Sequence, residues 1–191
     1  MSQRINLPNR KSIRLQLFDY SSSGLYYVTI MTYHRKHLFG KILNEKMIHN
    51  EAGFAAIDFW RSIPKHFQNV TLHEFVVMPN HIHGIIELHQ NENTKIRFNK
   101  FQKMIPGSIS AIVKGFKIGV TKWIRSKSVV GIVLAEYFLP ENDPNVSPQP
   151  VWQRNFYEHV IRNENSYQRI SNYIINNQKK WAGDRFNRKS P

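Results

Sequence analysis

The sequence contains no cysteine, which excludes disulfide bonds and thiolate metal ligands. It is also poor in acidic residues, with 13 Asp and Glu against 27 Lys and Arg and a formal net charge of +14. No apolar run approaches the roughly 18 residues that a membrane-spanning helix needs, and residues 1–14 are too polar for a signal peptide. We therefore expect a cytoplasmic protein with no membrane partner, and the charge favours a polyanion as its partner.

The length and composition are those of a folded chain. With 191 residues, 41% of them hydrophobic and 13% aromatic, the chain is long enough for one domain with a proper core. Residues 1–20 include Arg10 and Lys11 and are expected to form a basic arm, either ordered by a polyanion or solvated. Residues 21–191 are expected to form the single domain.

Both strand and helix patterns occur along the chain. Aromatic and β-branched residues predict strands over residues 25–32, 38–42, 70–77 and 81–88, with a further short strand over 129–135. Apolar residues at helical spacing predict helices from Asn50 to Pro64, over 106–125 and over 165–179. Four prolines predict an irregular loop over residues 137–150.

Two histidines stand one residue apart on the strand predicted over residues 81–88. Strand side chains alternate between faces, so His81 and His83 point the same way while Ile82 points the other. We expect Gly84 to leave room for a ligand beside the pair. The two imidazoles form half of a metal site and need at least one further ligand. The alternative is a pair of solvated histidines on an exposed sheet face.

The last predicted helix carries two residues that could complete such a site. Tyr173 and Asn177 stand four residues apart, so they lie one turn above the other on one flank of a helix. A phenol is able to attack a phosphodiester, and a carboxamide oxygen is able to bind a metal ion. The alternative for Tyr173 is an ordinary half-buried aromatic residue.

Three motifs in this chain resemble those of the REP-associated tyrosine transposases, relatives of the single-tyrosine insertion-sequence transposases. The first is similar to their HUH motif (histidine, hydrophobic residue, histidine) and reads Met78-Pro79-Asn80-His81-Ile82-His83-Gly84. The second reads Trp152-Gln153-Arg154-Asn155-Phe156-Tyr157-Glu158-His159-Val160-Ile161-Arg162, followed by Tyr173-Ile174-Ile175-Asn176-Asn177. The third runs from Ser108 to Lys117. Gln178 departs from the family, which usually has proline there, and we expect the helix to continue to Lys180 as a result.

The resemblance implies an α+β fold with a ferredoxin-like antiparallel sheet of four or five strands and helices mainly on one face. It makes Tyr173 the nucleophile and Asn177 the third metal ligand beside His81 and His83, with Mg²⁺ or Mn²⁺ as the ion. The implied activity is that of a transposase: a metal-dependent single-stranded DNA endonuclease and strand transferase that forms a 5′-phosphotyrosyl intermediate on REP-type hairpin DNA. A monomer is favoured over a dimer.

Several basic residues are expected to contact the DNA, with a solvated or structural role as the alternative: Arg10, Lys11, Lys114, Lys117, Lys122, Arg154, His159 and Arg162. Two other functions are compatible with the motifs. One is a domesticated hairpin-binding protein that no longer cuts, and the other is a metal-dependent hydrolase that acts through water.

Overall fold

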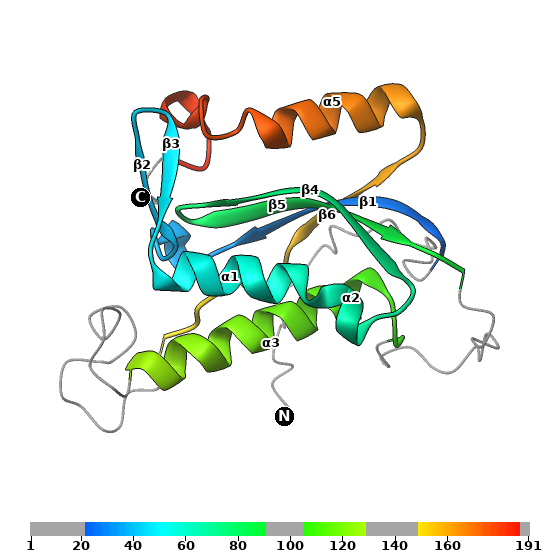
Figure 1. Cartoon of the computed structure of the whole chain (residues 1–191), viewed down its shortest axis with the longest axis horizontal. Coiled ribbons are helices and arrows are strands. Elements are labelled where there is room, and N and C mark those ends of the chain that lie inside the picture. Colours follow the sequence, from blue (N-terminus) through cyan, green and yellow to red (C-terminus); the bar gives the residue numbers. More distant parts are fainter. Residues whose placement is uncertain (1–21, 91–104, 129–148, 188–191) are drawn as a thin grey trace, which may run out of the picture.

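The computed structural model describes residues 22–90, 105–128 and 149–187. Its centre is a four-stranded sheet in the order β4-β5-β1-β6, in which every neighbouring pair is antiparallel. The strands are β1 (Gly24–Met31), β4 (Val70–Met78), β5 (His81–Leu88) and β6 (Tyr157–Ile161). With helical segments between β1 and β4 and again between β5 and β6, this order is ferredoxin-like, which confirms the predicted α+β fold (Figure 1).

Three helices cover one face of the sheet (Figure 1): α1 (Glu51–Arg61), α2 (Ile63–His66) and α3 (Ile109–Ser128). Asn50 caps α1 by accepting a hydrogen bond of 3.0 Å from the Gly53 backbone N–H. Small alanines on α1 allow the helix to approach the sheet, and Trp60 at its end is fully buried. The first predicted helix therefore ends at Arg61 rather than at Pro64, which lies in α2.

Gly84 serves this packing and not the histidine pair, so its predicted role is wrong. A Cβ atom on Gly84 would clash with the indole ring of Trp60. Gly84 lies one residue from His83, and strand alternation therefore turns it toward the helical core on the opposite face. The missing side chain makes room for Trp60 instead of for a ligand.

The other face of the sheet is covered more sparsely. Helix α5 (Glu164–Ile175) packs across β4 and β5 (Figure 1), and Asn163 caps it by accepting a 2.9 Å hydrogen bond from the Ser166 backbone N–H. A hairpin of β2 (Gly40–Leu43) and β3 (Lys46–His49) stands beside the helix end, with η1 (Tyr33–Arg35) and η2 (Trp181–Gly183) nearby. A second, smaller hydrophobic cluster joins α5 to the sheet.

Two further predictions differ from the structure. The last helix does not continue to Lys180 but ends at Ile175, and residues 176–180 form turns. Neither β3 nor β6 is predicted from the sequence. Strand β3 has four residues with a polar residue at each end, and strand β6 has five residues with Glu158 and His159 as its second and third, so neither shows a clear strand pattern. The strand predicted over 129–135 and nearly all of the loop predicted over 137–150 lie outside the described residues. No helix in the described ranges is long and apolar enough to cross a membrane.

Candidate active site

The two histidines lie side by side on β5, under α5. Their ring centroids are 4.4 Å apart, and both side chains are fully buried. Strand alternation places them on the face opposite to Ile82 and Ile86, which belong to the core beneath α1 and α3. The predicted shared face is therefore present, and the alternative of two solvated histidines is wrong.

The orientation of Asn80 fixes the tautomer of His81. Asn80 Nδ2 donates hydrogen bonds to the backbone oxygens of Phe186 at 2.8 Å and Arg35 at 3.2 Å, so Oδ1 is left as its acceptor. That oxygen lies 2.8 Å from His81 Nδ1, which must carry the proton and donate it. His81 Nε2 is then an unprotonated, buried atom without a hydrogen-bond partner in the described part of the chain.

Two hydroxyl groups of β1 hold His83 in the same way. Its Nδ1 atom lies 2.7 Å from Tyr27 Oη and 2.8 Å from Thr29 Oγ1. Because Thr29 donates its own proton to Tyr27 at 3.2 Å, its oxygen is free to accept a hydrogen bond from His83 Nδ1–H. Nε2 is then the acceptor atom of His83. Histidines that bind metals commonly donate their other ring N–H in this manner, which fixes the ring and its tautomer.

Tyr173 and Asn177 approach the two Nε2 atoms from α5 and from the turn that follows it. The Tyr173 hydroxyl donates to His83 Nε2 at 3.3 Å. Asn177 is fully buried and interacts with both His81 and Tyr173. Neither polar atom of its amide makes a well-formed hydrogen bond to a described residue. The structure thus brings together the four residues that the sequence singled out.

The site keeps its histidines neutral and its tyrosine protonated. Burial lowers the pKa of His81 to about 3, and burial together with the nearby His81 and Arg185 lowers the pKa of His83 well below its usual value. Burial and the Asp184 carboxylate raise the pKa of Tyr173, while Asn177 and Arg185 act in the opposite direction. Neutral imidazoles are the form that binds metal ions.

This donor set fits a divalent cation. A buried polar group without a good hydrogen bond costs about 1–3 kcal/mol, and neither the Asn177 amide nor His81 Nε2 makes a well-formed hydrogen bond to a described residue. A cation between them would accept both Nε2 lone pairs and the Asn177 Oδ1 lone pair. The described ranges hold no cluster of three or more His, Cys, Asp or Glu side chains suited to a metal, so the carboxamide is essential to such a site.

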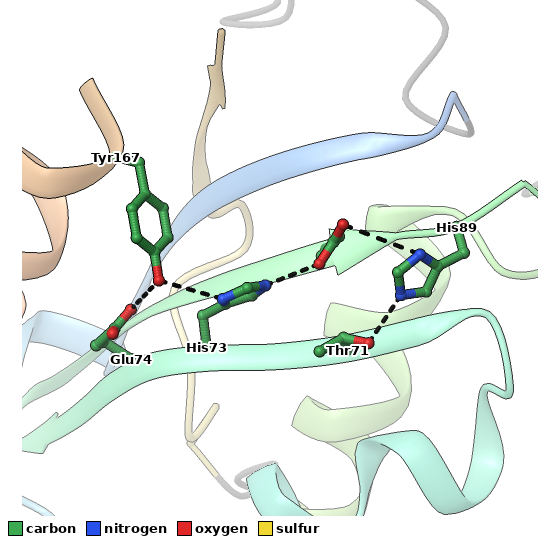
Figure 2. A network of polar contacts seen from close by, with 6 residues as sticks. Thr71, His73, Glu74, His89 and Tyr167 are labelled. Carbon is green, nitrogen blue, oxygen red and sulfur yellow. Dashed lines mark hydrogen bonds and ion pairs between the residues drawn. The ribbon is translucent and has the colours of Figure 1, made fainter. Parts of the chain in front are cut away.

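A network of polar side chains anchors the first half of α5 to the sheet (Figure 2). The register of β4 against β5 shifts between Leu72 and Phe75, and both His73 and Glu74 reach Tyr167 of α5. The Tyr167 hydroxyl donates to Glu74 Oε2 at 3.0 Å and lies 3.2 Å from His73 Nδ1. The anchor lies between one and two helical turns before Tyr173, so it helps to set the position of the phenol.

The network continues along the sheet away from α5. His73 Nε2 lies 2.9 Å from Glu87 Oε2, and the other Glu87 oxygen lies 3.9 Å from His89 Nδ1. His89 Nε2 in turn lies 2.7 Å from Thr71 Oγ1 (Figure 2). Glu87 shares the face of His83 but contacts these histidines instead of the candidate site.

Two aromatic residues that follow α5, Trp181 and Phe186, cover the histidine pair. The ring of Phe186 lies 4.8 Å from that of His81 and 5.7 Å from that of His83, centroid to centroid. Trp181 adds a contact with His81 at 6.0 Å. The Asn80 side chain hydrogen-bonds to both His81 and the Phe186 backbone, so the same residue positions the histidine and the segment that covers it. The aromatic contacts help to keep both imidazoles fully buried.

The basic residues expected to contact DNA fall into two groups. Arg154 and Arg162 are exposed at the two ends of β6, and His159 is partly buried on the histidine side, opposite Tyr27. The α3 lysines lie on the far side of the sheet, with Lys114 and Lys122 exposed. Arg10 and Lys11 lie outside the described residues.

Lys117 is engaged within the protein. Its Nζ group donates to the backbone oxygens of Gln153 at 2.8 Å and Asn155 at 3.1 Å, and burial lowers its pKa to about 8. In turn, the Trp152 indole N–H donates to the Lys117 backbone oxygen at 3.1 Å. The structure therefore uses Lys117 to fasten α3 to the segment before β6.

Three supporting residues were not singled out in the sequence: Asn80, Tyr27 and Thr29. Asn80 directly precedes His81 at the turn, so its position in the sequence could have indicated that its side chain contacts the imidazole. Tyr27 and Thr29 alternate on one strand, but their contact with His83 depends on β1 pairing with β5. Because the sequence does not give the order of strands in a sheet, the contact of these two hydroxyls with His83 could not be predicted from it.

The fold is that of a REP-associated tyrosine transposase. A solved structure of such a transposase bound to a REP hairpin superposes with a TM-score of 0.55 and 17% sequence identity, covering 90% of this chain and 74% of that one. The resemblance read from the motifs is thereby confirmed at the level of the fold.

The sequence itself has a nearer relative. An uncharacterized protein of Haemophilus influenzae is 40% identical over 183 residues, which cover 92% of each chain. The chain belongs to the same family as that protein. No protein-family model matches the sequence.

Proposed function

We propose that this protein is a metal-dependent single-stranded DNA endonuclease and strand transferase with Tyr173 as its nucleophile. The observation that supports this most directly is the convergence of His81 Nε2, His83 Nε2, the Asn177 amide and the Tyr173 hydroxyl in one buried site. The net charge of +14 suits a nucleic acid as the substrate. REP-type hairpin DNA is the proposed substrate, by analogy with the solved transposase complex.

In this proposal the two imidazoles and the Asn177 oxygen hold Mg²⁺ or Mn²⁺. The ion, when bound, supplies positive charge that stabilises the phosphate in the transition state. The Asn80 carboxamide and the Tyr27 and Thr29 hydroxyls contact the Nδ1 atoms, which would leave both Nε2 atoms unprotonated and available to hold the ion. The Tyr173 hydroxyl lies 3.3 Å from His83 Nε2, so the phenol that would act as the nucleophile is beside the residues that would hold the ion.

The proposed chemistry of Tyr173 is a nucleophilic displacement at phosphorus. Its Oη atom attacks the scissile phosphorus, the bond between phosphorus and the 3′ oxygen breaks, and the phenolic proton ends on that 3′ oxygen. The products are a free 3′-hydroxyl and a 5′-phosphotyrosyl bond, which retains the energy needed for later rejoining. Because the pKa of Tyr173 is raised in the protein alone, the phenol remains protonated and unreactive until the site is assembled.

The test is formation of a covalent adduct. End-labelled hairpin DNA is incubated with the protein and Mn²⁺ or Mg²⁺, and the mixture is resolved on a denaturing gel. We expect a protein–DNA band from the wild type and from Tyr33→Phe, a tyrosine outside the site, and no band from Tyr173→Phe or in EDTA.

Other outcomes would favour the alternative functions. Tight binding of the hairpin without any adduct from the wild type would indicate a hairpin-binding protein that no longer cuts. Cleavage that persists in Tyr173→Phe would indicate a hydrolase that uses water as its nucleophile.

A further inference from the structure

Helix α5 packs on β4 and β5, on the sheet face that carries the histidines (Figure 1). The hydrophobic cluster beneath it includes Ile161 at the end of β6 but not Tyr157 at the start of that strand. Tyr157 begins the edge strand β6 and is 47% exposed. A large aromatic ring therefore stands open to solvent next to the candidate active site.

The sheet register places Tyr157 in line with the site. Tyr157 pairs with Thr29, and Thr29 pairs with His83, so the three residues form one row across β6, β1 and β5. Directly paired residues in antiparallel strands share a face. Neighbouring strands lie about 4.8 Å apart, so the Cα atoms of Tyr157 and His83 are separated by about 10 Å. A single nucleotide is able to bridge that gap.

Tyr27 fills the space between the exposed ring and the histidine. Its hydroxyl lies 2.7 Å from His83 Nδ1, and its ring meets the ring of Tyr157 edge to face, with centroids 6.2 Å apart. This contact supports the Tyr157 ring on one side while leaving the residue half exposed. An exposed tyrosine is common on a protein surface. Tyr157 differs because Tyr27, which contacts its ring, also contacts the proposed metal ligand His83.

The charge around Tyr157 is suited to DNA. Arg154 lies three residues before Tyr157, and Arg162 follows the other end of β6, about 16 Å along the strand; both are exposed. Exposed aromatic rings interleaved with cations are the combination that binds single-stranded nucleic acids, because bases stack on the rings and the cations neutralise phosphates. The lysines of α3, by contrast, lie on the far side of the sheet.

We propose that Tyr157 is a stacking platform for an unpaired nucleobase adjacent to the scissile phosphate, with Arg154 and Arg162 binding the neighbouring backbone. This inference rests on the proposed function and adds a subsite to it. Since a paired base inside a duplex has both of its faces covered, the platform selects single-stranded over double-stranded DNA at the cleavage position.

The test measures binding without cleavage. Fluorescence anisotropy in EDTA compares two labelled probes, an oligothymidylate and a strand of equal length made of abasic sites. We expect Tyr157→Ala to weaken oligothymidylate binding about 5- to 100-fold and to leave binding of the abasic strand unchanged. Tyr157→Phe keeps a stacking ring and should bind like the wild type. Phe54→Ala removes another exposed aromatic residue, on α1 across the sheet, and should also bind like the wild type.

Photocrosslinking provides a second measurement that needs no variant. A strand containing 5-iodouracil, irradiated in complex with the wild-type protein, should crosslink to the peptide that contains Tyr157. Equal oligothymidylate binding by Tyr157→Ala and the wild type, or a crosslink confined to other peptides, would overturn the platform while leaving Tyr173 chemistry intact. A wild type that binds neither probe and forms no adduct would overturn both proposals together.

Discussion

The Gln178 side-chain oxygen accepts a hydrogen bond of 2.8 Å from the backbone N–H of Met47, which joins the residue after Asn177 to strand β3. Asn177 is not held by a regular helix, because α5 ends at Ile175 and the Asn177 N–H donates to Ile174 at 3.2 Å. The hairpin of β2 and β3 therefore supports the turn that carries a proposed metal ligand. Gln178 supplies this support where the REP-associated transposases usually have proline.

Replacing Gln178 should loosen the proposed metal site. We expect Gln178→Ala to weaken Mn²⁺ binding about tenfold, since residues that orient a ligand affect metal affinity to that extent. Isothermal titration calorimetry of the purified protein measures this. Gln168→Ala is the matched control, because Gln168 is an exposed residue of α5 that bonds only to Glu164 in the described structure. Unchanged Mn²⁺ affinity in Gln178→Ala would show that β3 does not support the site.

The Tyr167 hydroxyl should contribute to both stability and catalysis. Tyr167→Phe removes the hydrogen bonds to Glu74 and His73, and we expect the free energy of unfolding to fall by about 1 kcal/mol. Urea denaturation measures this loss. Adduct formation should also slow, because the anchor positions the helix that carries Tyr173. Wild-type stability together with wild-type adduct rates would mean that the network in Figure 2 does not anchor α5.

Removing the aromatic cover should open the site. Phe186→Ala deletes the ring that contacts both histidines, and we expect faster adduct formation together with a lower melting temperature. Rapid-quench sampling on denaturing gels and thermal unfolding provide the two readouts. Ile175→Ala, a change at a residue that is 59% exposed on α5, is the control. A slower reaction in Phe186→Ala would indicate that the ring organises the site instead of shielding it.

The buried histidines should make the metal-free protein sensitive to mild acid. Burial depresses the folded-state pKa of His81 to about 3, below the ordinary value of 6.5, so the unfolded chain binds more protons between those two values. The free energy of unfolding therefore keeps the whole contribution of neutral His81 above pH 6.5. It declines as the pH falls below that value, by up to about 1.4 kcal/mol per pH unit for each such histidine.

Denaturation in EDTA between pH 7 and pH 5 measures this decline, above the range in which ordinary carboxylates titrate. His81→Gln should show a shallower dependence than the wild type. Identical slopes for the two proteins would mean that His81 does not titrate in the way its burial requires.

The central arrangement of the site was accessible from the sequence because it depends on short-range geometry. Alternation along one strand is enough to place His81 and His83 on one face, and the motif resemblance selected Tyr173 from among eight tyrosines. The same alternation turns Gly84, one residue from His83, away from the pair, so this glycine belongs to the packing of Trp60 and not to the site.

The remaining features depend on contacts between distant segments. The role of Gln178 depends on β3, a strand of only four residues with a polar residue at each end. The contacts of Phe186 with the histidines and of Tyr27 with Tyr157 and His83 depend on Phe186 and β1 lying beside β5. The shift in register at His73 and Glu74 likewise leaves no local pattern, although it determines how α5 is anchored.

The most direct measurement is the identity of the residue that becomes attached to DNA. The adduct formed with Mn²⁺ is digested with nuclease and protease, and mass spectrometry locates the nucleotide on the protein. The proposed function predicts a nucleotide on the peptide that contains Tyr173, lost when His81 and His83 are both changed to alanine. A nucleotide on any other residue, or cleavage of the DNA with no attached nucleotide, would contradict it.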